Sequence, residues 1–459
     1  MSKISSAWSI RRGWPCVILS VGLAGCATAQ ARRYDGLAAD LRRTAASPRS
    51  TGGESPDIEA LASLDRIAFI RTVLARNPSI ETARQGWRAA LAEYPQATAL
   101  PDPMVEYSFA PLSIGSSDVS FGQVVGLSQR FPWPGKLALE GEVALAEAEV
   151  ARESYESTRQ RLALMASMLF DQYYAVARSL DLNEEHRRLA EDIKAAAEAQ
   201  YEAGRASQQE PLQAEVELSH VIHQRVVLDS RRAVIVAQMN GLLHRRPNLS
   251  LPPPPAQIDP GTHAIETSEA LYEQALRSRP ELRATASQIR GRESAVNLAE
   301  RQYYPDFGVM TSYNSMWMQP DHQWMVGLSL NIPIQLGARR GAVDQAEARL
   351  AQARSQLLSA DDEVQVEVER ARQRLIEANH VVRLYRERLL PAARAQIEAA
   401  RIGYETGRNG FQALIDAERS VRTVEIAHQE AIATLGQRRA ELDHAIGRVP
   451  GLPLEGDAP

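Results

Sequence analysis

Residues 404–408 read Tyr-Glu-Thr-Gly-Arg, and residues 201–205 read Tyr-Glu-Ala-Gly-Arg. Other short stretches recur at nearly the same distance, among them Val-Gly-Leu-Ser at 125–128 and 326–329. The offset stays at about 202 residues from one landmark to the next. A constant offset over so much of the chain predicts that one structural unit has been duplicated.

The duplication indicates how the chain is divided. We expect a first repeat at residues 59–248, a second repeat at 263–449 and a short tail at 450–459. Residues 249–262 lie between the repeats and include four consecutive prolines, which cannot continue a helix. This segment is therefore predicted to be a stiff linker.

The amino terminus has the pattern of a secretory signal peptide at residues 1–25, with basic residues, no acid and a short apolar run. It ends in Leu-Ala-Gly-Cys, which looks like a bacterial lipobox, so Cys26 is predicted to be lipidated. An ordinary signal peptide with a chance cysteine is the alternative. Residues 26–58 would then form a lipidated tether, and Ala27 after the cysteine implies sorting to the outer membrane.

The charge and the cysteine content of the chain limit its partners and its covalent cross-links. The chain has 52 Lys and Arg against 57 Asp and Glu, and its predicted signal peptide contains three basic residues and no acid. The mature chain therefore has a formal charge of −8, which argues against nucleic acid as a partner. Cys16 leaves with the signal peptide, and a single remaining cysteine excludes an internal disulfide.

Each repeat contains a pair of segments in which apolar and polar residues alternate, at residues 103–131 and 305–333. A period of two predicts β-strands, and about 10 residues suits one tilted transmembrane strand. We expect one series to face outward: Val105, Tyr107, Val326 and Leu328. Aromatic residues gather near the strand ends, as in interfacial girdles: Tyr107, Phe109, Phe131, Trp133, Tyr313 and Trp324.

A small soluble hairpin packed on helices also alternates and is the alternative to membrane strands. Four strands per chain are too few to close a barrel, and open strand edges are not tolerated in lipid. If these are membrane strands, several copies of the chain must complete the wall.

Long helices are predicted after the strands. Residues 137–200 contain no proline, and at about 1.5 Å per residue they would extend near 95 Å. Apolar residues recur at spacings of three and four and predict heptad seams: Leu162, Met165, Leu169, Tyr173, Val176 and Leu180 in the first repeat; Val364, Val368, Ala371, Leu375, Ala378, Val382, Tyr385 and Leu389 in the second. Gly204 and Gly407 interrupt the pattern, so we expect two hairpin tips, lying together at the end opposite the strands.

Together these features resemble the TolC family of outer-membrane efflux factors. Residues 129–136, Gln-Arg-Phe-Pro-Trp-Pro-Gly-Lys, are similar to the family's strand-to-helix junction, especially in its heavy-metal efflux branch, and residues 404–408 with 414–419 are similar to its tip motif. The resemblance implies a mainly α fold with a β-hairpin pair. Long coiled-coil helices would form a periplasmic α-barrel, and four strands per chain would contribute to a trimeric 12-stranded outer-membrane β-barrel.

The resemblance also implies a periplasmic gate formed by Tyr404, Arg408 and Asp416, with Glu210 as the acidic counterpart from the first repeat. The family often has a second acid one turn before Asp416, where this chain has Ala413. Ordinary solvated charge at a helix tip is the alternative. The tips would contact an adaptor protein through Gly204, Arg205, Gly407 and Arg408.

No catalytic constellation, phosphate loop or zinc-protease motif is present in the sequence, so we expect no enzyme and no cofactor. His220 and His223 could share a metal ion, but a solvated pair is the simpler interpretation because no third ligand is near. A loop cluster could contact soft metals or could simply pack: Met310, Met316, Met318, His322 and Met325. We expect no dedicated metal site.

The function implied is that of the outer-membrane channel of a tripartite efflux pump, a lipid-anchored homotrimer that passively exports heavy-metal cations. Its partners would be a periplasmic adaptor (membrane fusion) protein, an inner-membrane transporter of the RND type and outer-membrane lipid. One alternative keeps the duct but changes the cargo to drugs or to a protein of type I secretion. Another is a periplasmic coiled-coil lipoprotein without a pore.

Overall fold

The computed structural model describes residues 27–45, 61–115, 117, 121–258, 265–317 and 319–452. Several predicted features lie outside these described residues: the signal peptide, Cys26, residues 46–58 of the tether, the end of the linker, Met318 and most of the tail. Within the described ranges, no helix combines the length and the apolar character needed to cross a membrane.

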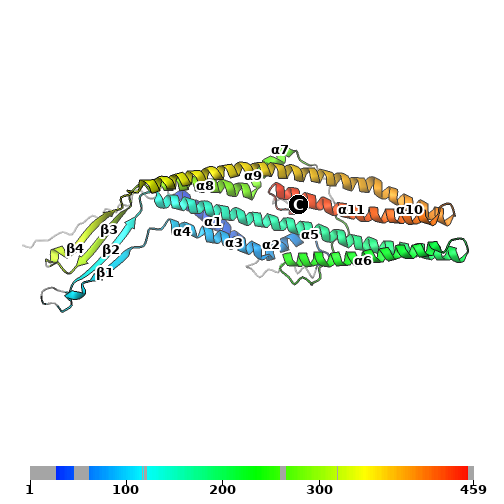
Figure 1. Ribbon diagram of the computed structural model, residues 1–459, viewed down its shortest axis with the longest axis horizontal. Helices are drawn as coiled ribbons and strands as arrows, with labels where there is room; N and C mark the ends of the chain where they lie inside the picture. The colour runs from blue at the N-terminus through cyan, green and yellow to red at the C-terminus, as the bar shows by residue number, and fades with distance from the viewer. Residues whose placement is uncertain are drawn as a thin grey trace, which may run out of the picture.

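The molecule is elongated, with a four-stranded sheet at one end and helices along the rest of its length (Figure 1). The two repeats have the same order of short helices, two strands and long helices. The first contains α2 (Arg66–Arg76), α3 (Pro78–Leu91), α4 (Glu93–Ala97), β1 (Met104–Phe109), β2 (Gln123–Phe131), α5 (Lys136–Glu202) and α6 (Gln209–Leu242). The second contains α7 (Ser268–Ser278), α8 (Pro280–Arg301), β3 (Phe307–Asn314), β4 (Trp324–Leu330), α9 (Leu336–Leu384), α10 (Leu390–Glu405) and α11 (Phe411–Ala445).

Helix α5 is continuous over 67 residues, about 100 Å at 1.5 Å per residue, in agreement with the prediction from the absence of proline. It packs against α3, α6, α8 and α11, and many of its buried residues are alanines, which let several helices approach it. The predicted seam is correct for Leu162, Tyr173, Val176 and Leu180, which are buried. It is wrong for Met165, which is 48% exposed, because a helix with several neighbours has no single seam.

The corresponding helix of the second repeat is interrupted. A π-helical turn, η4 (Tyr385–Leu389), separates α9 from α10, and Pro391 follows it. Proline has no N–H to donate to the preceding turn, and its ring clashes with a carbonyl there. A single π-helical turn accommodates the missing hydrogen bond within an otherwise continuous helix. The predicted seam holds from Val364 to Val382, where its members are buried, and ends at this turn.

The short helices at mid-length cover the long ones. Phe69 and Ile70 of α2 are fully buried with Phe170 and Tyr173 of α5 and Met239 of α6. Helix α7 packs in the same way against α9 in the second repeat. This packing leaves the sheet at one end and the helical tips at the other free of the main core (Figure 1).

The strands form one antiparallel sheet in the order β1-β2-β3-β4. The central pair, β2 with β3, joins the two repeats, and Leu127 lies opposite Thr311 in its register. Within the described residues, β1 pairs only with β2 and β4 pairs only with β3. The sheet therefore ends in two open edges.

Candidate functional site

The two faces of the sheet differ sharply in polarity. The register places Val105, Leu127, Thr311 and Val326 in one row, and side chains in one row share a face. That face is apolar and exposed: Val105 is 74%, Tyr107 57%, Val326 80% and Leu328 83% exposed, which places all four members of the predicted outward series on it. The opposite face, called the polar face below, has mostly polar and small residues: Glu106, Ser108, Gly126, Ser128, Arg130, Gly308, Ser312, Asn314, Gly327 and Ser329. Four apolar residues also lie on it: Met104, Val124, Met310 and Met325.

Aromatic rings form two groups at opposite ends of the strands. At the helix-proximal end, Phe131 stacks on Phe307 with centroids 5.6 Å apart, and Trp133 stacks on Tyr304 at 5.3 Å. At the far end Tyr313 lies 5.4 Å from Trp324. Phe109 and Phe121 stack at the same far end. Two aromatic bands separated by an apolar surface are typical of proteins that contact both interfaces of a bilayer.

The junction between sheet and helices is held by a buried ion pair that the sequence did not reveal. Lys136, at the start of α5, is 4% exposed, and its ammonium lies 2.7 Å from the carboxylate of Asp306. The same carboxylate accepts the backbone N–H of Trp133 at 2.9 Å. Lys136 also donates to the carbonyl of Tyr304. Residues 129–136 therefore attach the first repeat to the segment that leads into β3 of the second repeat.

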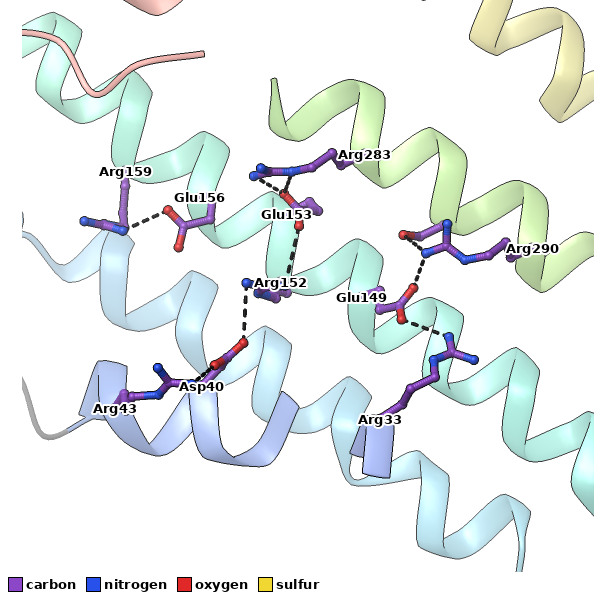
Figure 2. Close-up of polar contacts among 11 residues, drawn as sticks. Arg33, Asp40, Arg43, Glu149, Arg152, Glu153, Glu156, Arg159, Arg283 and Arg290 are labelled. Carbon is purple, nitrogen blue, oxygen red and sulfur yellow. Dashed lines mark hydrogen bonds and ion pairs between the residues drawn. The ribbon is translucent and has the colours of Figure 1, made fainter. Parts of the chain in front are cut away.

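Residues 27–45 of the expected tether form helix α1 (Ala27–Ala45), which lies against α3 and α5. Arg33 of α1 pairs with Glu142 of α5 at 2.5 Å. It also pairs with Glu149 of α5 at 2.8 Å (Figure 2). Glu149 also accepts Arg290 of α8 at 2.5 Å, so one carboxylate joins three helices. Burial opposes ionisation of Glu149, but the hydrogen bonds from Arg33 and Arg290 outweigh it and lower its pKa.

The two predicted tips lie together at the end of the molecule opposite the sheet (Figure 1). Gly204 has φ +69° and Gly407 has φ +70°, a left-handed conformation that glycine adopts without a Cβ penalty. In both tips the N–H of the following arginine donates to a carbonyl five residues earlier, Arg205 to Gln200 and Arg408 to Gly403, each at 2.8 Å. This is the Schellman pattern that ends a helix, so local sequence alone determines both turns.

A hydrogen bond joins the tips. The hydroxyl of Tyr404 donates to the carboxylate of Glu210 at 2.9 Å, beside a cavity of about 430 Å³ whose lining includes Arg205 and Gly407. Partial burial, followed by the hydrogen bond to Glu210, raises the pKa of Tyr404 to about 12. The phenol therefore remains a donor at every physiological pH.

The other residues predicted for a gate are not joined to this pair. Asp416 is exposed, accepts a hydrogen bond from Gln412 at 2.9 Å and lies 4.0 Å from Arg419. The side chain of Arg408 is exposed. Within one chain the tips are therefore linked through Tyr404 and Glu210, while Arg408 and Asp416 face solvent.

The structure also shows where the methionines and histidines considered as metal ligands lie. Met310 and Met325 lie on the polar face of the sheet, in neighbouring rows, and both are more than two-fifths exposed. His322 packs edge-on against Trp317 in the loop before β4. Across the described part of the chain, no three His, Cys, Asp or Glu side chains gather as ligands, and His223 is an exposed residue of α6.

Comparison with known proteins agrees with this geometry. The sequence pattern of the outer membrane efflux protein family matches residues 69–243 and 271–448, one match in each repeat, and the chain belongs to this family. A comparison with curated protein sequences gave no match.

Solved structures of the same fold include three outer-membrane channels. CusC is 17% identical with a TM-score of 0.72, covering 83% of this chain and 92% of its own. VceC from Vibrio cholerae is 15% identical with a TM-score of 0.70 and coverage of 83% and 96%. MtrE from Neisseria gonorrhoeae, solved in its open state, is 20% identical with a TM-score of 0.66 and coverage of 83% and 89%. The expected TolC-like fold is thereby confirmed.

Proposed function

We propose that three copies of this chain form a passive exit duct in the outer membrane. The observation that carries the proposal is the sheet, which has one apolar, exposed face and two open edges. Lipid would cover the apolar face, and neighbouring copies would satisfy the edges by completing a barrel of twelve strands. The long helices would continue this barrel as a tunnel across the periplasm.

The tips would be the entrance. Substrate would arrive from an inner-membrane transporter of the RND type, which supplies the energy, and the hairpins of a periplasmic adaptor would pack around Gly204, Arg205, Gly407 and Arg408. The hydrogen bond between Tyr404 and Glu210 supports a closed resting gate, because it holds the two tips of one chain together. Arg408 and Asp416 would complete the gate by contacts between copies.

The anchor would be Cys26, acylated after removal of residues 1–25. Helix α1 starts at Ala27, and Gln30 donates to the carbonyl of Ala138, near the start of α5 and close to the sheet. A lipid on the preceding residue would therefore lie at the membrane end of the molecule. A single lipid signal gives only marginal anchoring, and the barrel would supply the durable attachment.

Heavy-metal cations are the proposed cargo. Support comes from the junction at residues 129–136, which resembles the heavy-metal branch, and from the thioethers of Met310 and Met325 on the polar face. Such side chains offer soft, weak contacts, which suit a duct through which ions must pass without being retained. Drugs or an exported protein remain the alternative cargo.

A matched pair of charge substitutions on β4 tests the duct. Leu328→Arg places a cation on the apolar face, where it should destabilise membrane insertion by about 2–4 kcal/mol, whereas Ser329→Arg places the same charge on the polar face. We expect Ser329→Arg to assemble as a heat-modifiable trimer with reduced cation conductance in planar bilayers. Leu328→Arg should fail to assemble.

Two results would contradict the proposal. Absence of conductance, together with loss of membrane residence after mutation of Cys26, would favour a coiled-coil lipoprotein without a pore. Equal behaviour of the two variants would mean that the apolar face does not meet lipid. Cargo is tested separately by deleting the gene and comparing tolerance to Cu, Ag, Zn, Co and Cd with tolerance to a drug panel.

A further inference from the structure

A second link between the two hairpins lies above the tips, in the interior of the helical bundle. His186 of α5 is 4% exposed, and its two ring nitrogens face two carboxylates of α11. Nε2 lies 3.1 Å from Glu425, and Nδ1 lies 3.5 Å from Glu418. Counting about 1.5 Å per residue from the tip glycines, this cluster is some 17–27 Å from the tips.

The charged and titratable groups around His186 come from every helix at this level. They include a second histidine of α11, His428, which interacts electrostatically with Glu425 and Arg394. Helix α11 supplies Glu418, Arg422 and Glu425; α10 supplies Arg394, which pairs with Glu425 at 2.8 Å; and α6 supplies Glu217, which pairs with Arg419 and lies 3.8 Å from Arg422. Arg422 pairs with Glu418 at 3.2 Å. The first hairpin (α5 and α6) and the second (α10 and α11) are thus joined by one ionic network.

The geometry selects one protonation state of the histidine. A neutral imidazole has one N–H, so it can donate to only one of the two carboxylates and turns a lone pair toward the other. An imidazolium donates from both nitrogens. Nδ1 of His186 is fully buried without a hydrogen-bond partner, and the Glu418 oxygen nearest to it, Oε1 at 3.5 Å, accepts a hydrogen bond from Arg422. A buried nitrogen 3.5 Å from a carboxylate indicates that this contact is completed when the ring carries both protons and moves closer.

Helix packing alone does not require a charged residue here. The position equivalent to His186 in the second repeat is Leu389, an ordinary apolar residue, and the equivalent of Glu418 in the first repeat is Glu215, which is about half exposed and pairs with Lys194. Buried ionic groups seldom add net stability compared with apolar ones, so their presence is better explained by specificity or switching.

We propose that the contact of His186 with Glu418 and Glu425 holds the two helical hairpins together above their tips in a pH-dependent way. This contact, called the latch below, is closed when the imidazole is doubly protonated. His186 is then a positioning residue for the tips. The inference rests on the proposed function only for its effect on conduction; the joining of the hairpins is a property of the fold.

The sign of the pH effect follows from the site. Burial disfavours the imidazolium, but its interactions with Glu418 and Glu425 outweigh burial and raise the pKa of His186. A raised pKa stabilises the joined state fully below the ordinary histidine pKa, and this stabilisation is lost as pH rises through the raised value. The latch should therefore be tight in mildly acidic medium and loose in alkaline medium.

A cysteine pair across the hairpins measures the latch in the full-length protein. The side-chain amides of Gln213 and Gln412 are 2.6 Å apart between α6 and α11, so Gln213→Cys with Gln412→Cys places two thiols on facing helices. Motions that bring these thiols to disulfide distance should be more frequent when the hairpins are joined. The oxidation rate is compared between the His186 background and His186→Gln at pH 5.5 and 8.5. The two backgrounds contain the same thiols. The ratio of their oxidation rates, His186 background to His186→Gln, therefore cancels the intrinsic pH dependence of thiol oxidation.

We expect the His186 background to oxidise about fivefold faster or more at pH 5.5, and the ratio to approach one at pH 8.5. His223→Gln, an exposed histidine of α6, is the matched control and should give a ratio near one at both pH values. Equal ratios at the two pH values for His186→Gln would overturn the latch. A ratio for His223→Gln that follows pH in the same way would also overturn it.

If His186→Gln fails to assemble, Glu425→Gln provides the second variant. It removes the charge of one acceptor, so the pH dependence should weaken and move to lower pH; an unchanged dependence contradicts the proposal. Conductance separates the latch from the duct. A protein that oxidises as expected but conducts no ions even at pH 8.5, where the latch is loose, retains the latch and rejects the duct.

Discussion

Tyr404 and Glu210 are 194 positions apart in the sequence, and the phenol of the first donates a 2.9 Å hydrogen bond to the carboxylate of the second. The bond connects α10 with the start of α6, so it joins one repeat to the other at the point farthest from the sheet. It is a contact between tips and not within one tip. Its loss should therefore change how often the tips separate rather than how each tip folds.

Tyr404→Phe removes this bond and leaves the ring packed against Phe411. At a partly exposed site, the loss of one hydrogen bond to a charged acceptor should weaken the closed tips by about 1 kcal/mol, or about fivefold in the closed-to-open ratio. Single-channel recording should show correspondingly more frequent opening. Tyr201→Phe, at the equivalent position of the first repeat and 45% exposed, is the control and should behave as wild type. If Tyr404→Phe leaves the closed times of the channel unchanged, this hydrogen bond does not hold the proposed gate closed.

Gly407 has φ +70°, and a Cβ built there meets nothing within 4 Å. Substitution by alanine is therefore opposed by backbone strain alone, about 1 kcal/mol, whereas asparagine tolerates the left-handed region better. Hydrogen exchange at the tip should accelerate about fivefold in Gly407→Ala and less in Gly407→Asn. Gly341→Ala, at a glycine of α9 whose added Cβ also meets nothing within 4 Å and whose φ is not left-handed, is the control. Equal exchange at the tip in Gly407→Ala and Gly341→Ala would mean that the left-handed conformation is not what determines the tip.

Glu367 of α9 should stabilise the protein in a pH-dependent way. Burial opposes its ionisation, but hydrogen bonds from His444 and Arg279 prevail and lower its pKa to about 2. A lowered pKa contributes stability above the ordinary glutamate value, and this contribution is lost as pH falls through the folded value. The side chain is still 42% exposed, so solvent screening limits the effect to about 1 kcal/mol or less.

The melting temperature of Glu367→Gln should accordingly be lower than that of the wild type at pH 7, and the two should converge near pH 2. Glu363→Gln, an exposed carboxylate on the same helix, should show no such convergence. If the difference in melting temperature between the wild type and Glu367→Gln grows as the pH falls, Glu367 does not stabilise the protein in its charged form.

The features that sequence predicted are those with local causes. Glycine at 204 and 407 specifies the turns, alternation specifies the strand faces, and the absence of proline specifies the length of α5. Each depends on residues within one or two helical turns of one another. The heptad seam failed at Met165 because periodicity shows that a face is buried but not how many neighbours bury it.

The features that sequence missed are pairings over long distances. Lys136 and Asp306 are 170 positions apart, and His186 and Glu425 are 239 apart. Any of 57 acidic residues could have been the partner of either cation, and nothing local distinguishes them. Helix α1 was missed for a similar reason, because its position depends on an apolar site formed by α3 and α5 together.

The docking of α1 tests which of two forces holds it. Leu37 is 6% exposed among Trp87, Leu91 and Leu145, and truncating such a side chain costs about 2–3 kcal/mol. The ion pairs of Arg33 are partly solvated and should contribute about 1 kcal/mol or less.

Leu37→Ala should therefore raise hydrogen exchange in residues 27–45 by about 30-fold or more, and Arg33→Ala by about fivefold or less. Arg43→Ala, whose side chain is 78% exposed in a pair with Asp40, serves as the surface control and should change little. If Arg33→Ala raises exchange in α1 more than Leu37→Ala does, the ion pairs around Glu149 contribute more to the free energy of docking than is expected of partly solvated pairs. Charge rather than apolar burial would then hold α1 against α3 and α5.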